Sequence, residues 1–183
     1  MTSFLPGAIK LFKYYRSLAE KAMDQVDDSG FFWHENEQSN SIAIIVRHVS
    51  GNMLSRFTDF LTSDGEKPWR NRDEEFNEGM ETRSELMMQW NRGWDQLLNT
   101  LEGLKETDLS RIVYIRNEGH TVLDAVTRQL AHYPYHVGQI VYIAKMYRGE
   151  GWQSLSIPRG ESSLYNEKKF SAERGTRHFT DNV

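Results

Sequence analysis

The sequence predicts an all-α protein built as a four-helix bundle, and three observations support this fold class. Four long segments carry apolar residues at spacings of three and four, short stretches rich in turn residues separate them, and no strand pattern is sustained. The chain of 183 residues has 38% hydrophobic and 26% charged residues, which is ordinary globular usage. We therefore expect a single domain over residues 1–183, consisting of a helical bundle and a tail.

The first two helices are predicted at about residues 6–28 and 41–62. Either Asn40 or Ser41 can cap the second helix, because both side chains accept hydrogen bonds from the first-turn N–H groups. Residues 62–78 follow as a loop, since they contain Gly, Pro and dense charge without a helical period. We expect this charge run to form a solvated surface.

The third and fourth helices are predicted at about residues 80–104 and 121–148. Between residues 108 and 120 the apolar period changes, and an Asn-Glu-Gly turn separates two short runs, which predicts a small hairpin-like segment. Residues 149–183 are expected to form an extended C-terminal tail. Within it, residues 152–163 are expected to be ordered, because large apolar side chains there need somewhere to pack.

The composition makes several classes of function improbable on physical grounds. With 22 Lys and Arg against 26 Asp and Glu, the net charge of -4 gives no strong positive field for a phosphate backbone, so nucleic acid is not an expected partner. No apolar run approaches the ~20 residues that cross a bilayer, and the first residues lack a signal-peptide pattern, which predicts a cytoplasmic protein without membrane association. The chain has no cysteine, so any transition-metal site must use His with Asp or Glu.

Three histidines form the candidate site. His132 and His136 are four residues apart, so on one helix face their β-carbons lie about 5–6 Å apart and two imidazoles can converge on one ion. His48 stands in a bulky apolar run of the second helix, where an unpaired imidazole would be unfavourable. All three flank the apolar faces of their helices, and together they predict one bound divalent metal ion. For His48 taken alone, the alternative is a core histidine bonded to a carbonyl.

Pro134 lies between the two histidines of the fourth helix and predicts a kink or bulge there, because proline removes a helical hydrogen bond. Two interpretations remain open: a tolerated bend, or a distortion that aims His136 into the site. The remaining histidines are expected at surface or turn positions: His34, His120 and His178.

Two segments resemble the DinB-like metal-binding superfamily, which includes YfiT-like proteins and bacillithiol S-transferases. They are IAIIVRHVSGNMLSRF at residues 42–57 and NEGHTVLDAVTRQLAHYPYHVGQIVYIAK at residues 117–145. The tail segment SLSIPRGES is similar to one uncharacterised branch, and the likeness extends from the first helix to Ser163. The resemblance implies a four-helix bundle, a metal triad at His48, His132 and His136, zinc or nickel as the ion, and a homodimer. It does not imply DNA binding.

Three neutral imidazoles leave coordination positions open, which is typical of a catalytic metal site. One reading is a metal-dependent transferase that uses a low-molecular-weight thiol such as bacillithiol as cosubstrate. The second is a metal-dependent hydrolase acting through acidified water, and the third is a non-catalytic, metal-stabilised binding protein. No acidic residue lies one turn from any of the three histidines on its own helix, so no general base is assigned. Four polar neighbours are noted, each more simply an ordinary helix or tail residue: Asn52, Tyr135, Gln139 and Arg159.

Overall fold

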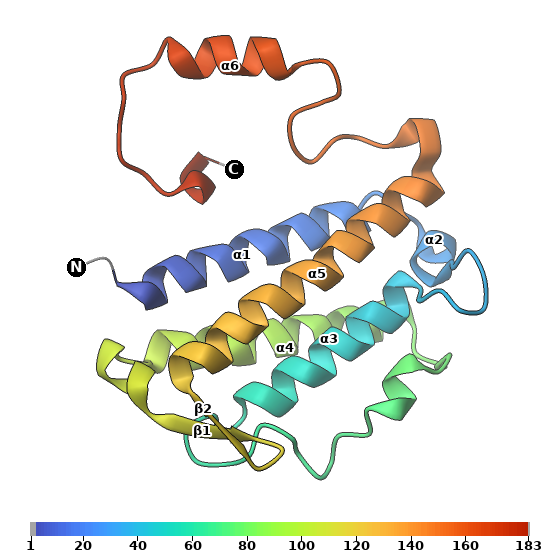
Figure 1. The fold of residues 1–183 in the computed structure, drawn as a ribbon. Helices are drawn as coiled ribbons and strands as arrows, with labels where there is room; N and C mark the ends of the chain where they lie inside the picture. Colours follow the sequence, from blue (N-terminus) through green and yellow to red (C-terminus); the bar gives the residue numbers. More distant parts are fainter. Residues whose placement is uncertain (1–2, 183) are drawn as a thin grey trace.

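The structure, a computed structural model, describes residues 3–182 and is mostly helical, with one small antiparallel sheet (Figure 1). Its α-helices and strands, in chain order, are α1 (Phe4–Met23), α2 (Asp28–Phe32), α3 (Ile42–Phe57), α4 (Arg83–Gly103), β1 (Ile112–Ile115), β2 (Glu118–Thr121), α5 (Val122–Arg148) and α6 (Ser162–Phe170). The short 3-10 helices are η1 (Asp73–Phe76), η2 (Glu106–Ser110), η3 (Gly149–Gly151) and η4 (Phe179–Asn182).

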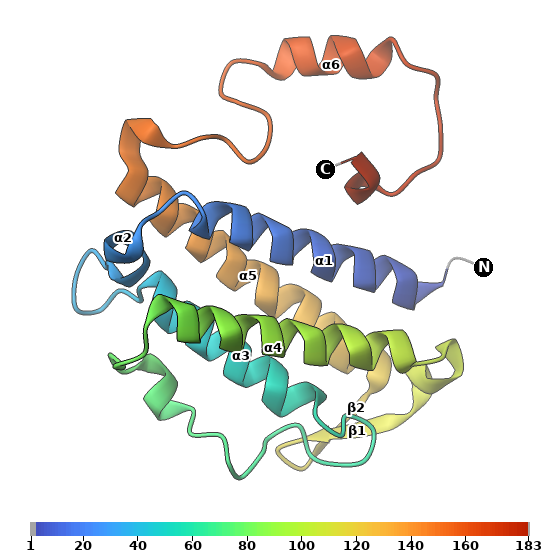
Figure 2. The ribbon, with the colours of Figure 1, turned by 180° about the vertical axis from the view of Figure 1, so that it is seen from behind.

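The four long helices pack around a common core. Helix α3 lies along α4 and α1 lies along α5, while α1 also contacts α4 and α3 also contacts α5 (Figure 2). Aromatic rings fill the centre: Trp94 is 6.4 Å from Phe12 and 6.1 Å from Tyr133 between ring centroids, and all three side chains are fully buried. Such pairs add about 0.5–1.5 kcal/mol each beyond the burial of their apolar area. The predicted helical fold class is thereby confirmed in its broad form.

Two helices end earlier than the sequence pattern predicts. The first helix was expected to run to residue 28, but α1 ends at Met23 and a separate helix, α2, begins where the Asp27 side chain accepts the Gly30 N–H at 2.8 Å. The second helix was expected to reach residue 62, but α3 ends at Phe57, shortly before Asp59 turns to a φ of 49°. Asp27 is extended where it caps α2, and Thr58 is extended at the end of α3, so the backbone is not helical at either position although the apolar period runs on past both.

The kink or bulge expected at Pro134 does not interrupt the fourth long helix. Helix α5 is one continuous α-helix from Val122 to Arg148, with Pro134 inside it. The neighbouring Tyr133 is fully buried, and its hydroxyl donates to Asn52 Oδ1 of α3 at 2.9 Å. Packing on both sides therefore holds the helical backbone against the local preference of proline.

The loop between α3 and α4 corrects the expectation of a solvated charge run at residues 62–78. Lys67 and Glu75 are buried, and the side chain of Arg70 is only 2% exposed. Arg70 pairs with Glu75 at 2.7 Å, and Arg56 of α3 donates to the carbonyl oxygen of Gly65. Because each charge or polar group finds a partner, the segment folds against α3 despite its polar composition.

The expected hairpin is present as β1 and β2, joined by a two-residue turn. Arg116 and Asn117 have φ values of 56° and 62°, which suits the tight turns that join antiparallel strands. The Asp64 carboxylate accepts the backbone N–H groups of Arg116 at 2.9 Å, Asn117 at 2.8 Å and Glu66 at 2.7 Å. Asp64 thus ties the α3–α4 loop to the hairpin.

We expect Asp64→Asn to destabilise the fold by about 1–2 kcal/mol, because the new amide group would face an N–H donor and lose one hydrogen bond. Burial acts to raise the pKa of Asp64, but the backbone donors outweigh it and hold the pKa below its ordinary value of 3.8. This stabilisation is therefore present above pH 3.8 and is lost as the pH falls through the folded-state pKa. Urea unfolding at pH 7 measures the loss, with Glu118→Gln on the exposed part of the same hairpin as control. Equal midpoints for the two variants would contradict the role of Asp64.

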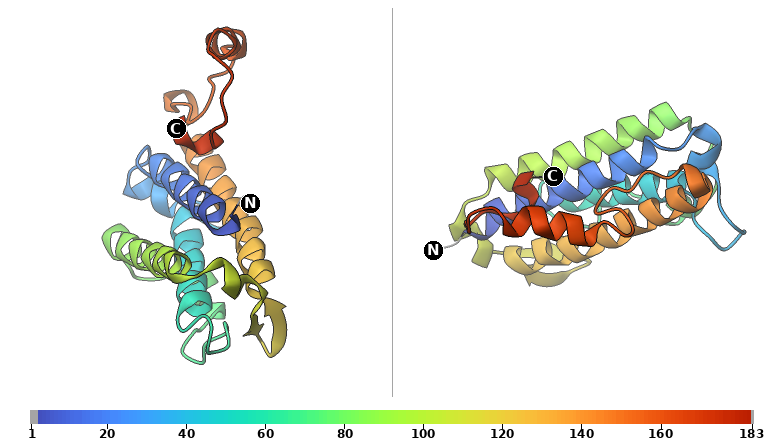
Figure 3. Two further views of the ribbon diagram at one scale, coloured as in Figure 1. Left: turned by 90° about the vertical axis from the view of Figure 1, so that its left-hand side faces the viewer. Right: turned by 90° about the horizontal axis from the view of Figure 1, so that it is seen from above.

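The tail is more structured than expected but lies largely apart from the four long helices. Residues 162–170, expected to be extended or frayed, form α6, whose side chains are all exposed (Figures 1 and 3). Trp152 and Leu155 pack against the core as predicted, whereas Ile157 is 40% exposed. Among residues 3–182, no helix has both the length and the apolar character that crossing a membrane requires.

Candidate metal centre

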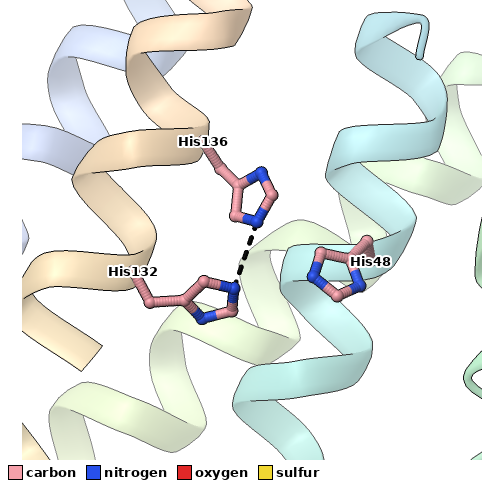
Figure 4. A group of neighbouring side chains, drawn as sticks. All are labelled: His48, His132 and His136. Atoms are coloured by element: carbon pink, nitrogen blue, oxygen red, sulfur yellow. Dashed lines mark hydrogen bonds between the residues drawn. The ribbon is translucent and has the colours of Figure 1, made fainter. Parts of the chain in front are cut away.

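The three predicted histidines meet between α3 and α5. His48 projects from α3 toward the pair on α5, and the donor nitrogens of the three rings lie within 4.8 Å of one another (Figure 4). The centroid of the His48 ring is 5.7 Å from that of His132 and 5.0 Å from that of His136. His48 and His136 are buried, and His132 is half-buried. The packing of α3 on α5 thus brings together ligands 84 and 88 residues apart in the sequence (132 − 48 and 136 − 48).

Each imidazole is oriented by a partner at its outer nitrogen. His48 Nδ1 lies 2.9 Å from Glu75 Oε2, and His136 Nδ1 lies 2.8 Å from Gln139 Oε1. His132 Nδ1 lies 3.2 Å from Gln129 Oε1. Because carboxylate and amide oxygens only accept hydrogen bonds, each of these contacts places the proton on Nδ1 and leaves Nε2 with a free lone pair.

The inner face of the cluster is therefore suited to a cation. The Nε2 atoms of His132 and His136 are 3.1 Å apart, although neither carries a proton in the tautomer that its outer partner selects. Two lone pairs facing each other repel unless a positive centre lies beside them. Ligands of tetrahedral zinc at about 2.0–2.1 Å are roughly 3.3 Å apart, close to this separation. The donor set and the geometry both fit a divalent transition-metal ion.

Glu75 is the part of this site that sequence reasoning missed. Its carboxylate accepts from His48 and also from Arg70 Nε and Nη2, at 2.7 and 2.8 Å. Burial acts to raise the pKa of Glu75, but the hydrogen bonds from Arg70 and His48 outweigh it and leave the pKa lowered. The ring of Phe76 also packs against His48, with 4.7 Å between the two ring centroids. The loop carrying these two residues has no period, so no sequence pattern indicated that it reaches the site.

Burial and neighbouring positive charge keep the α5 histidines neutral. Burial lowers the pKa of His132 to about 4, helped by the charges of His136, His48, Arg56 and Arg128. Burial also lowers the pKa of His136. Neutral imidazole is the form that ligates a metal, so the site does not have to release protons from these rings before binding at neutral pH.

The four polar neighbours noted in the sequence occupy different places. Gln139 orients the His136 ring through a hydrogen bond, and Asn52 accepts a hydrogen bond from the Tyr133 hydroxyl. Both residues therefore lie next to the cluster. Tyr135 is 63% exposed, with its ring centroid 5.1 Å from that of His136. Arg159 lies in the exposed tail and has no recorded contact with the cluster.

The other histidines lie outside the cluster. His34 faces Glu78 at 3.4 Å in the loop after α2, and His178 lies in the tail before η4. His120 is on β2, where its Nε2 atom is buried without a hydrogen-bond partner. Among residues 3–182, the group of potential metal ligands around His48 consists of His48, His132 and His136. Glu75 contacts the outer side of His48, so the candidate ligands among the described residues are the three histidines.

Comparison with protein-family models matches residues 1–161 to DUF1572, described as a protein of unknown function. DUF1572 is a DinB/YfiT-like family, which agrees with the resemblance carried by the two histidine segments. Comparisons with curated proteins and with solved structures found no match. Because the family model covers most of the chain and both histidine segments, this protein belongs to the DUF1572 family.

Proposed function

We propose that this protein is a DinB/YfiT-type four-helix bundle that binds one divalent transition-metal ion, zinc or nickel, through His48, His132 and His136. We further propose that it transfers a low-molecular-weight thiol, such as bacillithiol, to an electrophilic small molecule. The observation that carries the proposal is the convergence of three Nε2 lone pairs without a fourth ligand from the described residues. Open positions are what a reacting cosubstrate requires.

The residues around the triad support this chemistry in distinct ways. A divalent ion bound here would lower the pKa of a coordinated thiol, which makes the thiolate available at neutral pH. Glu75, Gln129 and Gln139 hold the three rings in the tautomer that ligates. Arg128 is exposed on α5 one turn before His132, and its charge would attract a thiol that carries carboxylates. Because the chain has no cysteine, the attacking sulfur would have to come from the cosubstrate.

Two alternatives are less well supported by the geometry. A hydrolase needs a general base beside the attacking water, but Glu75 is held by Arg70 and faces the outer nitrogen of His48. A non-catalytic, metal-stabilised protein predicts a closed site with four ligands, whereas the described residues supply three.

The test is spectroscopic and uses cobalt-substituted protein. Addition of bacillithiol is expected to produce a thiolate-to-cobalt charge-transfer band and to shift the visible bands, because the sulfur enters an open position. A mixture of metal-loaded protein, bacillithiol and 1-chloro-2,4-dinitrobenzene should then form the thioether faster than the mixture without protein. An unchanged spectrum would favour the closed, non-catalytic site, and ester hydrolysis without any thiol would favour the hydrolase.

A homodimer is also proposed, on the resemblance alone. Trp152 and Leu155, which could have supplied an interface, pack partly against the core of their own chain. Light scattering at micromolar concentrations should give about twice the 21.4 kDa chain mass, and a monomer mass throughout would remove this proposal.

A further inference from the structure

A pocket of about 380 Å³ opens beside the histidine cluster, between the loop after α2 and helices α3 and α5. Its size falls within the range of small-molecule sites, which is roughly 300–1,000 Å³. The lining is mixed. Its polar part comes from the loop after α2 and from Gln139, and its apolar part consists of five side chains: Trp33, Ile45, Tyr142, Ile143 and Met146. Tyr142 and Met146 are 65% and 42% exposed, so an occupant would cover apolar surface that now faces solvent.

The pocket is connected to the triad by a shared residue. Gln139 lines the pocket, and its Oε1 lies 2.8 Å from Nδ1 of His136. Ile45, which also lines the pocket, precedes His48 by about one turn of α3. A molecule in this pocket would therefore lie about one helical turn from the metal ligands on both helices.

The charge of the lining determines which class of molecule fits. Glu35 lines the pocket, and neither Lys nor Arg does. His34, also in the lining, is bonded through Nδ1 to the carbonyl oxygen of Asn36 and faces Glu78 at 3.4 Å. An anionic ligand would meet the Glu35 carboxylate here, with no positively charged lining residue to pair with it.

We propose that this pocket binds the uncharged aromatic or aliphatic body of the electrophilic substrate. This inference rests on the proposed thiol transfer. In that reaction the thiol sulfur forms a bond to the electrophilic carbon, the bond from that carbon to its leaving group breaks, the leaving group departs with the electron pair, and the thiol proton passes to solvent.

The test uses two unreactive probes, nitrobenzene and 4-nitrobenzoate, with zinc-loaded protein. Nitrobenzene should shift the methyl NMR signals of Ile45, Ile143 and Met146, and its protons should relax faster when cobalt replaces zinc. We expect 4-nitrobenzoate to bind at least roughly fivefold more weakly, because its charge lies near Glu35. Nitrobenzene that leaves these methyl signals unchanged, or equal binding of the two probes, would overturn the proposal.

A matched pair of variants isolates the charge effect. Glu35→Lys should remove most of the discrimination against 4-nitrobenzoate, whereas Glu37→Lys makes the same charge change at an exposed position outside the lining and should retain it. Equal behaviour of the two variants would refute the assignment of Glu35. These measurements require no turnover, so a protein that binds nitrobenzene but transfers no thiol would refute the proposed function and leave the pocket in place.

Discussion

His136→Ala is expected to abolish stoichiometric metal binding, whereas the parent protein should carry close to one transition-metal ion per chain. The substitution removes one of three converging donors and leaves two, which hold an ion far more weakly. The loss of affinity should exceed the 10–100-fold that follows from mutating a residue that only orients a ligand. Metal analysis of the purified, untagged protein provides the measurement, and His48→Ala should give the same result.

His178→Ala is the matched control, because His178 lies in the tail and outside the cluster. It should retain the parent's metal content. If His48→Ala and His136→Ala also retain it, the ion is bound elsewhere and the triad is refuted. A parent that contains no metal and binds neither added zinc nor added nickel would leave a helical protein with buried histidines, and the enzymatic proposal would lose its main support.

Glu75→Ala is expected to have the largest effect on stability, about 3–5 kcal/mol, because it leaves the buried Arg70 guanidinium with only the long contact to Glu66 at 3.9 Å. The Arg70 side chain is 2% exposed, so water cannot replace the lost carboxylate without a structural change. The same substitution removes the acceptor that orients His48, and metal affinity should fall by 10–100-fold. Urea unfolding of the metal-free protein and competition with a chelator measure the two effects separately.

Two further variants separate stability from ligand orientation. Glu74→Ala changes a neighbouring exposed carboxylate, bonded to Asn77 at 3.0 Å, and should leave stability and metal affinity close to those of the parent. The double variant Arg70→Met/Glu75→Met removes both buried charges, so it should recover much of the stability but not the metal affinity. Recovery of both properties in the double variant would show that Glu75 stabilises the fold without orienting His48.

Helical periodicity was sufficient to predict the long helices and the two histidines of α5. Apolar residues at spacings of three and four repeat over several turns, so α3, α4 and α5 are found close to their predicted positions. His132 and His136 are neighbours within one helix, and their proximity follows from helix geometry alone. The convergence of His48 with them was predicted from the apolar faces and from the family resemblance, and the structure brings the three rings together.

Local events that carry no period explain the errors at helix ends. The Asp27 cap and the left-handed Asp59 each depend on one residue, so a stripe of apolar residues extends past both without a visible change. At Pro134 the local rule predicted a kink or bulge, whereas α5 continues through it as an α-helix. The buried Tyr133 and its hydrogen bond to Asn52 outweigh that preference, and only the packed structure could reveal it.

The sequence by itself determined the helical class, the hairpin and the His132–His136 pair, because the apolar period, the turn residues and the four-residue spacing are all local features of the chain. Only the tertiary structure decided that Glu75 reaches His48, that Arg70 neutralises it, and that the loop after α2 forms a pocket beside Gln139. These contacts join irregular segments to helices, and Glu75 and His48 are 27 residues apart in the sequence. The energy that places them comes from pairing buried charges, which depends on the final positions of the partners and leaves no periodic trace in the sequence.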